Sequence, residues 1–280
     1  MKTYYSHNGK IFEIIDPAIS ASNHGYRYGD GLFETMKMKN GRMPLFDDHV
    51  ERLFNGMEIL GFTVPGSFTK QNMEDEIIAL ATKNNCVKLA RIRLTVVRGN
   101  GGINDCDDKL QYTIECMQAD NAIDRLNENG FSIDIFPDSV KSCDKFSNLK
   151  TTSYLSYVMA AQFAKNNKLN DALIFNQHSR ICESSIANIF WINKKSIYTP
   201  PLSECCVAGV MRKFLLDKIS IAGYQTSEKE LTEEILFNAD EVFLTNAVYG
   251  IRWVKQFKDK LYTGNLINNI YQSILSPLWK

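Results

Sequence analysis

The sequence lacks both a strong charge imbalance and a long apolar run. Its 280 residues contain 32 Lys plus Arg and 32 Asp plus Glu, so the formal net charge is zero, and no long basic stretch is present. A chain without clustered positive charge is poorly suited to the phosphate backbone, which argues against nonspecific nucleic-acid binding. No apolar stretch approaches the roughly 20 residues that a membrane-spanning helix requires. We therefore expect neither nucleic-acid nor membrane partners.

The sequence also lacks an export signal and a cysteine pairing motif. Residues 1–10 are polar, without the apolar core of a signal peptide. The seven cysteines are an odd number with no C-x-x-C pair, and Cys205 and Cys206 are adjacent, which places them badly for an ordinary disulfide. In a protein that is not exported, cysteines are usually reduced. We expect a cytoplasmic protein with reduced thiols.

Metal and nucleotide motifs are missing as well. The four histidines are scattered without the spacing of metal ligands, so we expect no metal site; they are His7, His24, His49 and His178. The glycines of Arg98-Gly-Asn-Gly-Gly102 match neither G-x-x-x-x-G-K-[ST] nor G-x-G-x-x-G, and they follow a strand without opening a helix. They predict a turn rather than a nucleotide loop.

The sequence contains enough apolar residues for a substantial core, since 44% of its residues are hydrophobic. Its length suggests one or two domains. The first part predicts an α+β unit. Asn8-Gly9 and Asn40-Gly41 each lie between strand-like runs, as in hairpins. A helix is predicted from an apolar stripe, with Asp47 or Asp48 as its N-cap; the stripe is Val50, Leu53, Phe54, Met57 and Leu60.

The remaining elements follow from local patterns. A second helix is predicted at about 69–84, and a strand at 90–96, where apolar residues alternate with Arg91, Arg93 and Thr95; residues 110–117 would pair with it. The polar stretch 119–130 predicts a linker. It divides a smaller domain, 1–118, from a larger one, 131–280. In the latter we expect strands at about 131–136, 171–176, 186–192, 195–199 and 241–245, and helices at about 153–166, 208–222 and 265–275.

The stretch from Lys150 to Arg212 contains the parts that a pyridoxal phosphate site needs. Lys150-Thr-Thr-Ser-Tyr154 begins a helix-like segment, Glu183-Ser-Ser-Ile-Ala-Asn188 begins an apolar strand, and Ala208-Gly-Val-Met-Arg212 opens another helix. A lysine forms the imine with the cofactor's aldehyde, and a carboxylate keeps the ring nitrogen protonated. A helix N-terminus receives the phosphate.

Taken together, the motifs of this chain and their order resemble those of the class IV aminotransferases, the pyridoxal-phosphate enzymes of fold type IV. Besides the two around Lys150 and Glu183 and the helix start at Gly209, Gly29-Asp-Gly-Leu-Phe-Glu34 resembles the family's G-D-G-x-F-E strand and His49-Val-Glu-Arg-Leu53 its H-x-x-R-L helix. Asp240–Ala247 resembles the strand and turn that complete its phosphate cup. The resemblance implies two α/β domains with the cofactor between them, a small amino substrate, and a homodimer in which one subunit's first domain closes the other's site.

The resemblance also implies roles for individual residues. Lys150 would bond the cofactor's aldehyde, rather than Lys141 or Lys145 of the same loop, because it alone precedes a run like the family's K-x-x-N-Y-L. Glu183 would bind the ring nitrogen, with Asn188 at the family's spacing; the alternative is an ordinary turn carboxylate. Tyr154 would either bind the cofactor's phenolate oxygen or be a core aromatic on the helix stripe with Val158.

The phosphate ligands expected from the resemblance lie far apart in the sequence. The guanidinium of Arg52 presents a planar fork to phosphate oxygens, although by spacing alone it would be a solvated helix residue. Val210 and Met211 would offer backbone N–H groups at a helix start, and Gly209 would allow close approach of the chain. Thr245 and Asn246 would add side-chain donors from a facing turn.

Local details favour one reaction of the family. Gly209-Val-Met-Arg212, Thr245-Asn-Ala247 and the Arg98–Gly102 loop resemble 4-amino-4-deoxychorismate lyases, which release 4-aminobenzoate and pyruvate for folate synthesis. The R-x-H that traps the substrate carboxylate in D-amino-acid aminotransferases is replaced by Ile103 and Asp105. A branched-chain or D-amino-acid aminotransferase remains the alternative, and a paralogue without catalysis a remote one. Substrate contacts are expected from Tyr26, Arg27, Tyr28, Arg98 and Arg252.

Overall fold

The structure is a computed structural model that describes residues 2–16 and 19–279, and the chain divides into two compact units. Unit 1 comprises Met1–Asn121 and Leu149–Tyr154, and unit 2 comprises Ala122–Asn148 and Leu155–Lys280. The division expected from composition assigned all of 131–280 to the second domain. In the structure the short segment that carries Lys150 instead belongs to unit 1, because it pairs with a strand of that unit.

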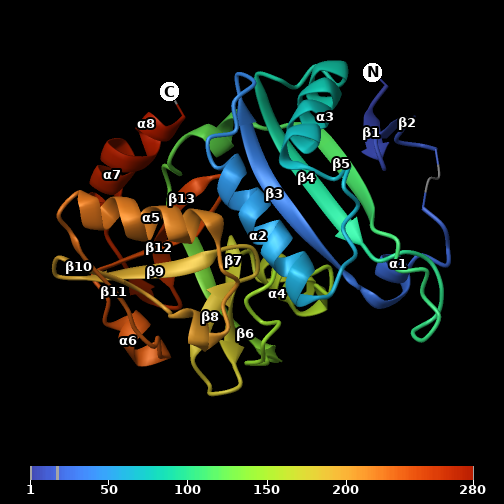
Figure 1. The fold of residues 1–280 in the computed structure, drawn as a ribbon. Coiled ribbons are helices and arrows are strands. Elements are labelled where there is room, and N and C mark those ends of the chain that lie inside the picture. The colour runs from blue at the N-terminus through green and yellow to red at the C-terminus, as the bar shows by residue number, and fades with distance from the viewer. Residues whose placement is uncertain (1, 17–18, 280) are drawn as a thin grey trace. The chain divides into compact units, whose positions relative to one another are not determined.

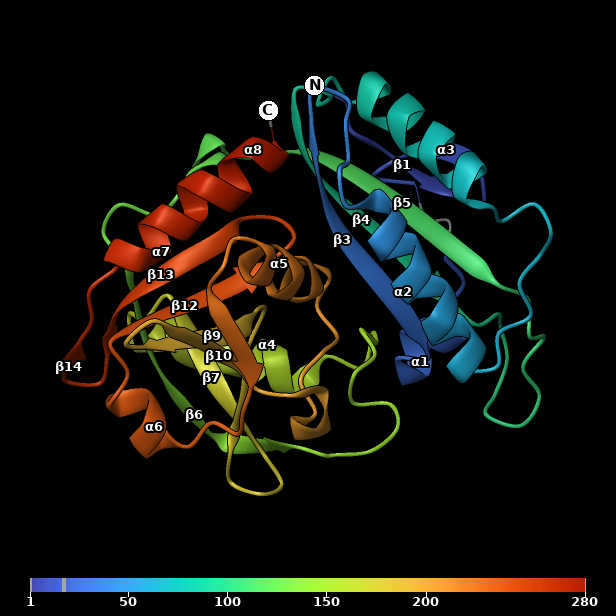
Figure 2. The same cartoon turned by 60° about the vertical axis from the view of Figure 1, so that its left-hand side comes forward.

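Unit 1 is a five-stranded antiparallel sheet with two helices along one face (Figures 1 and 2). The strand order is β2-β1-β5-β4-β3. Apolar residues of β3 and β4 that point towards the helices, among them Met36, Ile92 and Leu94, form its core with Leu53 and Ile77. Its elements are β1 (Tyr4–His7), β2 (Lys10–Glu13), α1 (His24–Tyr28), β3 (Gly31–Lys39), α2 (Phe46–Ile59), α3 (Lys70–Lys83), β4 (Leu89–Val97) and β5 (Gln111–Gln118).

Several local predictions for unit 1 are confirmed and two are wrong. Helix α3 begins after Thr69, whose hydroxyl accepts the N–H of Asn72, and Asn8-Gly9 closes the β1–β2 hairpin. Asp47 and Asp48 do not cap α2; the cap residue is Leu45, and the two acids lie in the first turn, where they favour the helix dipole. The second Asn-Gly turn, at residues 40–41, closes a single bridge rather than a hairpin, because β3 pairs with β4 instead.

Unit 2 is built on a nine-stranded mixed sheet with the order β11-β10-β9-β12-β13-β6-β7-β8, and β14 pairs with β13. Its elements are η1 (Asn121–Asp124), β6 (Phe131–Lys141), α4 (Leu155–Asn166), β7 (Asp171–Asn176), β8 (Ile181–Ser184), β9 (Asn188–Asn193), β10 (Ser196–Thr199), η2 (Leu202–Glu204), α5 (Val210–Ile221), β11 (Gln225–Glu228), α6 (Glu233–Phe237), β12 (Glu241–Asn246), β13 (Gly250–Phe257), β14 (Lys260–Leu261), α7 (Asn265–Ile270), the π-helical turn η3 (Tyr271–Leu275) and α8 (Ser276–Leu278).

Strand β7, which lies between β6 and the edge strand β8, is covered on both faces, which explains its continuous apolar sequence. Ala172 and Ile174 pack with Ala160 and Ala164 of α4, whereas Leu173 belongs to a second core with Leu236 of α6. Together the two units give the α+β class that the sequence predicts. Within the described ranges, no helix combines the length and apolarity needed to cross a membrane.

The expectation that all thiols are reduced is wrong. Cys143 and Cys205 form a disulfide, with Cα atoms 5.1 Å apart and 62 positions apart in sequence. No spacing motif marks this pair, because a loop before Lys150 meets the turn after η2 only in the folded unit. The other five cysteines are free thiols, and four of them are buried.

Candidate active site

Lys150 lies in an extended segment at the open edge of β3 and not at a helix start. Its carbonyl accepts the N–H of Phe33 at 2.9 Å, and Thr152 donates its N–H to Gly31 at 2.9 Å. Gly31 has no room for a side chain, since an added Cβ would lie 2.4 Å from the Val96 carbonyl oxygen. The Lys150 amine lies 4.5 Å from the centre of the Phe33 ring. The lysine is thus held against an aromatic surface by backbone pairing.

Tyr154 also packs on this surface. Its ring meets Phe33 edge-on at 5.3 Å, and Lys150 Nζ lies 5.7 Å from its centre. Helix α4 begins one residue later, and Val158 is 53% exposed. The alternative that placed Tyr154 on the helix stripe with Val158 is therefore wrong, because the residue precedes the helix.

The structure brings Arg93, which the sequence argument did not single out, to the same ring. Its guanidinium carbon lies 3.8 Å from the centre of Phe33. Arg93 pairs with Thr35 and Phe33 pairs with Thr95, so the two are diagonal neighbours on one face of the sheet. Burial lowers the pKa of the Arg93 guanidinium. The alternation of Arg91, Arg93 and Thr95 carried this signal, because it places both arginines on the face that α2 and α3 do not cover.

Arg52 lies on the helix-covered side of the same sheet, in a buried ionic cluster. Its Nε donates to Glu34 Oε1 at 2.8 Å and its Nη2 to Oε2, which also accepts His49 Nδ1 at 2.6 Å. Burial would raise the pKa of Glu34, but the Arg52 and His49 charges and hydrogen bonds lower it to about 2. Arg52 is therefore a fixed guanidinium rather than a solvated helix residue.

In unit 2, Glu183 is a buried carboxylate held from three directions. Oε1 accepts Lys141 Nζ at 2.5 Å and the Tyr157 hydroxyl at 2.6 Å, and Oε2 accepts the N–H of Val207 at 2.9 Å. The residue is 3% exposed, so it is not an ordinary turn carboxylate. Of the two other lysines considered for the imine, Lys141 is bound to Glu183, and Lys145 lies over Phe146.

The helix start at Gly209 is shaped by Asn188. The Asn188 side chain donates to the Val207 carbonyl at 2.9 Å, and a Cβ on Gly209 would lie 2.0 Å from Asn188 Oδ1. Gly209 caps α5 without a side-chain hydrogen bond, so the first N–H groups of this helix, including Val210 and Met211, have no intrahelical partner. A helix start with free backbone N–H groups suits an anion.

The side-chain donors of the facing turn are already engaged. Thr245 donates its hydroxyl to the Gly250 carbonyl at 2.7 Å, and the Asn246 amide donates to the Ile186 carbonyl at 3.2 Å. Asn246 Oδ1 accepts the N–H groups of Val248 and Tyr249. Both side chains thus order the turn itself.

The arginines nominated for the substrate bind the protein's own backbone. Arg27 donates to the carbonyls of Ala21 and Gly101. Arg98 pairs with Asp30 at 2.8 Å and donates to the Leu60 carbonyl. The buried Arg252 donates to the carbonyls of residues 122, 125, 249 and 251.

The two nominated tyrosines differ in their surroundings. Tyr26 is 77% exposed and lines a mainly apolar cavity of about 500 Å³ in unit 1, together with Thr152 and Val97. Tyr28 is 43% exposed and contacts His24, whose ring lies edge-on at 4.6 Å. Only Tyr26 therefore lines a cavity next to the Lys150 segment.

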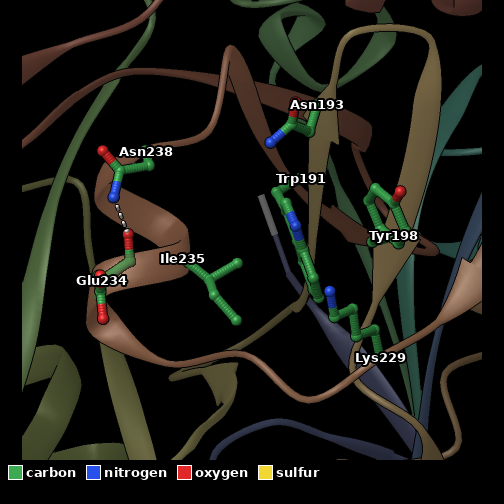
Figure 3. Close-up of a pocket in the computed structure, with 7 residues that line it drawn as sticks. All are labelled: Trp191, Asn193, Tyr198, Lys229, Glu234, Ile235 and Asn238. Carbon is green, nitrogen blue, oxygen red and sulfur yellow. Dashed lines mark hydrogen bonds between the residues drawn. The ribbon is translucent and has the colours of Figure 1, made fainter.

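A second cavity, in unit 2, lies away from these residues. It measures about 310 Å³ and is lined by residues of β9, β10, α6 and the segment after β11 (Figure 3). Trp191 reaches it from the face of β9 opposite to that of Asn188, because the two are an odd number of positions apart. This cavity is separate from the Glu183 and Gly209 cluster.

These groups fit pyridoxal phosphate. Unit 1 offers an amine for the aldehyde, and unit 2 offers a carboxylate and a helix start that a single Cβ on Gly209 would fill. No group of three His, Cys, Asp or Glu side chains placed to hold a metal ion occurs in the parts of the chain that the structure describes.

Comparison with known proteins places the chain in a family. The model of the family "Amino-transferase class IV" matches residues 31–257. A Methanocaldococcus jannaschii protein provisionally named a branched-chain-amino-acid aminotransferase is 29% identical over 96% of this chain and 90% of its own. The aminodeoxychorismate lyase of Bacillus subtilis is 27% identical over 87% and 83%. The fold matches the branched-chain aminotransferase of Thermoproteus uzoniensis with a TM-score of 0.88, 20% identity and coverage of 100% and 95%.

The chain therefore belongs to the class IV aminotransferase family. It is a pyridoxal-phosphate enzyme, of a family that contains both aminotransferases and aminodeoxychorismate lyases.

Proposed function

We propose that the protein is an aminodeoxychorismate lyase that converts 4-amino-4-deoxychorismate into 4-aminobenzoate and pyruvate for folate synthesis. The observation that carries the proposal is the Phe33 surface, against which Lys150 and Arg93 both lie. One aromatic ring thus contacts both an amine that can bond an aldehyde and move a proton and a guanidinium that suits a substrate carboxylate. Arg93 takes the place of the arginines 27, 98 and 252 in this role.

The chain's residues would share the remaining work. Bound pyridoxal phosphate supplies an aldehyde and an electron-accepting ring. Lys150 would hold the cofactor through its aldehyde, and as a free amine it would take the proton from the substrate carbon that bears the amino group. Glu183 would hold the ring nitrogen in its protonated form through Oε2. Arg52 and the first N–H groups of α5 would bind the phosphate.

Elimination is favoured over D-amino-acid transamination by the loop after β4. Ile103 is 72% exposed, and Asp105 accepts the Gly102 N–H at 2.6 Å, so this loop presents no cation at the positions of the D-amino-acid carboxylate trap. The Gly209–Arg212 and Thr245–Ala247 sequences also resemble those of lyases. The elimination needs no second substrate, because loss of a proton and of pyruvate leaves an aromatic ring.

A branched-chain aminotransferase is the second candidate. It is favoured by the Methanocaldococcus jannaschii relative, whose match is the longer of the two reported and covers 96% of this chain. Such an enzyme requires a keto-acid acceptor for every turnover, whereas a lyase does not. The two reactions are therefore separated by whether product forms without an acceptor.

The experiment supplies 4-amino-4-deoxychorismate alone and follows pyruvate with lactate dehydrogenase. In parallel, branched-chain L-amino acids and D-alanine are each offered with 2-oxoglutarate, and glutamate is measured. Sustained pyruvate release without an acceptor is expected. Glutamate formation together with no pyruvate release would assign the protein to the aminotransferases. Lys150→Ala should abolish whichever reaction is seen, and Lys145→Ala, in the same loop, should not.

We further propose that the enzyme is a homodimer, as the family resemblance implies, and that it acts in the cytoplasm. Light scattering at micromolar concentration should give twice the monomer mass of 31.9 kDa. A fully active monomer would contradict the dimer without affecting the proposed reaction.

A further inference from the structure

Lys141 has no role in the chemistry proposed above, yet it makes a short contact to the carboxylate of Glu183. It is the last residue of β6, and its side chain is 14% exposed. Its amine lies 2.5 Å from Glu183 Oε1 and 5.4 Å from the centre of the Tyr157 ring. Because the lysine side chain is largely removed from water, its ammonium depends on the carboxylate of Glu183 as its partner.

The two oxygens of Glu183 are occupied unequally. Oε1 accepts two donors, Lys141 and Tyr157, which fills the two positions that a carboxylate oxygen offers. Oε2 accepts one donor among the described residues, the N–H of Val207. One acceptor position is left on Oε2. Val207 lies two residues before Gly209, so this oxygen faces the segment that leads into the start of α5.

We propose that Lys141 positions Glu183 and balances its charge. Lys141 occupies Oε1, so that Oε2 alone receives the ring nitrogen, and its positive charge weakens the hold of the carboxylate on the ring proton. The inference rests on the proposed role of Glu183 at the cofactor. Lys141 acts through Glu183 and need not touch the cofactor.

The effect expected of Lys141 depends on which other charges lie around Glu183. The other titratable groups around Glu183 are Tyr157 of α4, Cys182 of β8, Cys206 and, beyond Cys206, Arg212 of α5. Burial raises the pKa of Cys182 well above its usual value and that of Cys206 to about 12, so both thiols are neutral. Arg212 is paired with Glu228. Among the described residues, the Lys141 ammonium is therefore the charge that directly balances Glu183.

A positive charge close to a proton-binding group lowers that group's pKa, and its removal raises it. Without Lys141, the bound cofactor would hold its proton more firmly. A neutral residue at position 141 should therefore shift the titration of the bound cofactor to higher pH. A change that only loosened the loop would weaken binding without that upward shift.

The test uses the visible absorbance of the bound cofactor, titrated with pH in purified holoenzyme. Lys141→Met and Lys141→Gln are each expected to raise the pH midpoint by about one unit or more. Lys141→Arg, which keeps the charge, should restore the wild-type midpoint. Lys145→Met, an exposed lysine of the same loop, is the matched control and should leave it unchanged.

Each outcome bears on a separate claim. An unchanged or lowered midpoint in the neutral variants, or no rescue by arginine, would overturn the role of Lys141. So would loss of cofactor binding in both neutral variants when circular dichroism shows that they fold. A wild-type protein without cofactor absorbance would instead refute the proposed function on which the inference rests.

Discussion

Each unit contains a buried carboxylate with a cationic partner, and the two are built differently. Glu34 in unit 1 is 2% exposed and accepts three hydrogen bonds, two from Arg52 and one from His49. Glu183 in unit 2 is 3% exposed and also accepts three, but from three different residues, Lys141, Tyr157 and Val207. Both oxygens of Glu34 bind the same guanidinium, whereas Oε2 of Glu183 binds only the backbone N–H of Val207, beside the Gly209 turn.

The difference separates a carboxylate that aims another side chain from one that is prepared for a ligand. A bidentate carboxylate fixes the plane of an arginine, so Glu34 serves Arg52. The donors of Glu183 come from three separate segments and no side chain is aimed by it, which suits the cofactor contact proposed for Oε2. Burial and charge are alike at the two positions, and the direction of the donors distinguishes them.

The largest effect is expected at Lys150, the amine of unit 1. Lys150→Ala should fold but form no covalent bond with the cofactor, so turnover should be lost entirely. Mass mapping after borohydride reduction of the wild type should locate the pyridoxyl group on Lys150. An adduct on Lys141 or Lys145 would contradict this assignment, and one on Lys141 would also contradict its description as a partner of Glu183.

Glu183→Gln tests the carboxylate of unit 2. A neutral amide does not hold the ring nitrogen protonated, so turnover should fall by a hundredfold or more, about 3 kcal/mol in the barrier, while the cofactor stays bound. Glu204→Gln is a suitable control, since it removes another buried ion pair of unit 2, the one with Arg180. Activity of the Glu183 variant within a few-fold of wild type would assign the role elsewhere.

Arg93→Met tests the cation of unit 1. Loss of a charge-assisted contact to a carboxylate should raise KM about ten- to a hundredfold, with little change in kcat or in cofactor affinity. Arg91→Met, two positions earlier on the same face of β4, should have a much smaller effect. Equal effects of the two changes would mean that the sheet face as a whole, and not Arg93, attracts the substrate.

The smallest effect on catalysis and a clear effect on stability are expected for Glu34→Gln. The folded-state pKa of Glu34 is lowered to about 2 from an ordinary 4.5. Its contribution to the free energy of unfolding, about 3 kcal/mol, is therefore fully present above pH 4.5 and lost as the pH falls towards 2. Urea unfolding between pH 2 and 7 should show a steeper acid loss in the wild type than in the variant. Parallel curves would contradict the ionised cluster.

Local sequence predicted what depends on local chemistry. The helix predicted at about 69–84 is α3, which begins after Thr69, and the alternation at 90–96 marks the two faces of β4. The α+β class and the family followed from motifs that carry backbone requirements, such as Gly209 beside Asn188. These features need no knowledge of distant neighbours.

Features that depend on distant neighbours were missed or misplaced. Lys150 precedes a helix in sequence, but its backbone pairs with β3, more than a hundred residues earlier. Arg93 was set aside as one arginine of an alternating strand, and only the diagonal contact with Phe33 distinguishes it from Arg91. Arg98 and Arg252 were nominated by position, yet both bind backbone carbonyls that only the fold brings near.

The Cys143–Cys205 bond joins two distant parts of the chain covalently. It closes a ring of the chain that includes Lys150 and Glu183. Segment 149–154 of this ring belongs to unit 1, and the rest of the ring belongs to unit 2. A single proteolytic cut within this ring, for example after Asn167, would leave both fragments joined until a reductant is added. Closing a ring of this length also removes conformations from the unfolded chain, worth about 4 kcal/mol. Residues assigned to two different units thus share one covalent loop.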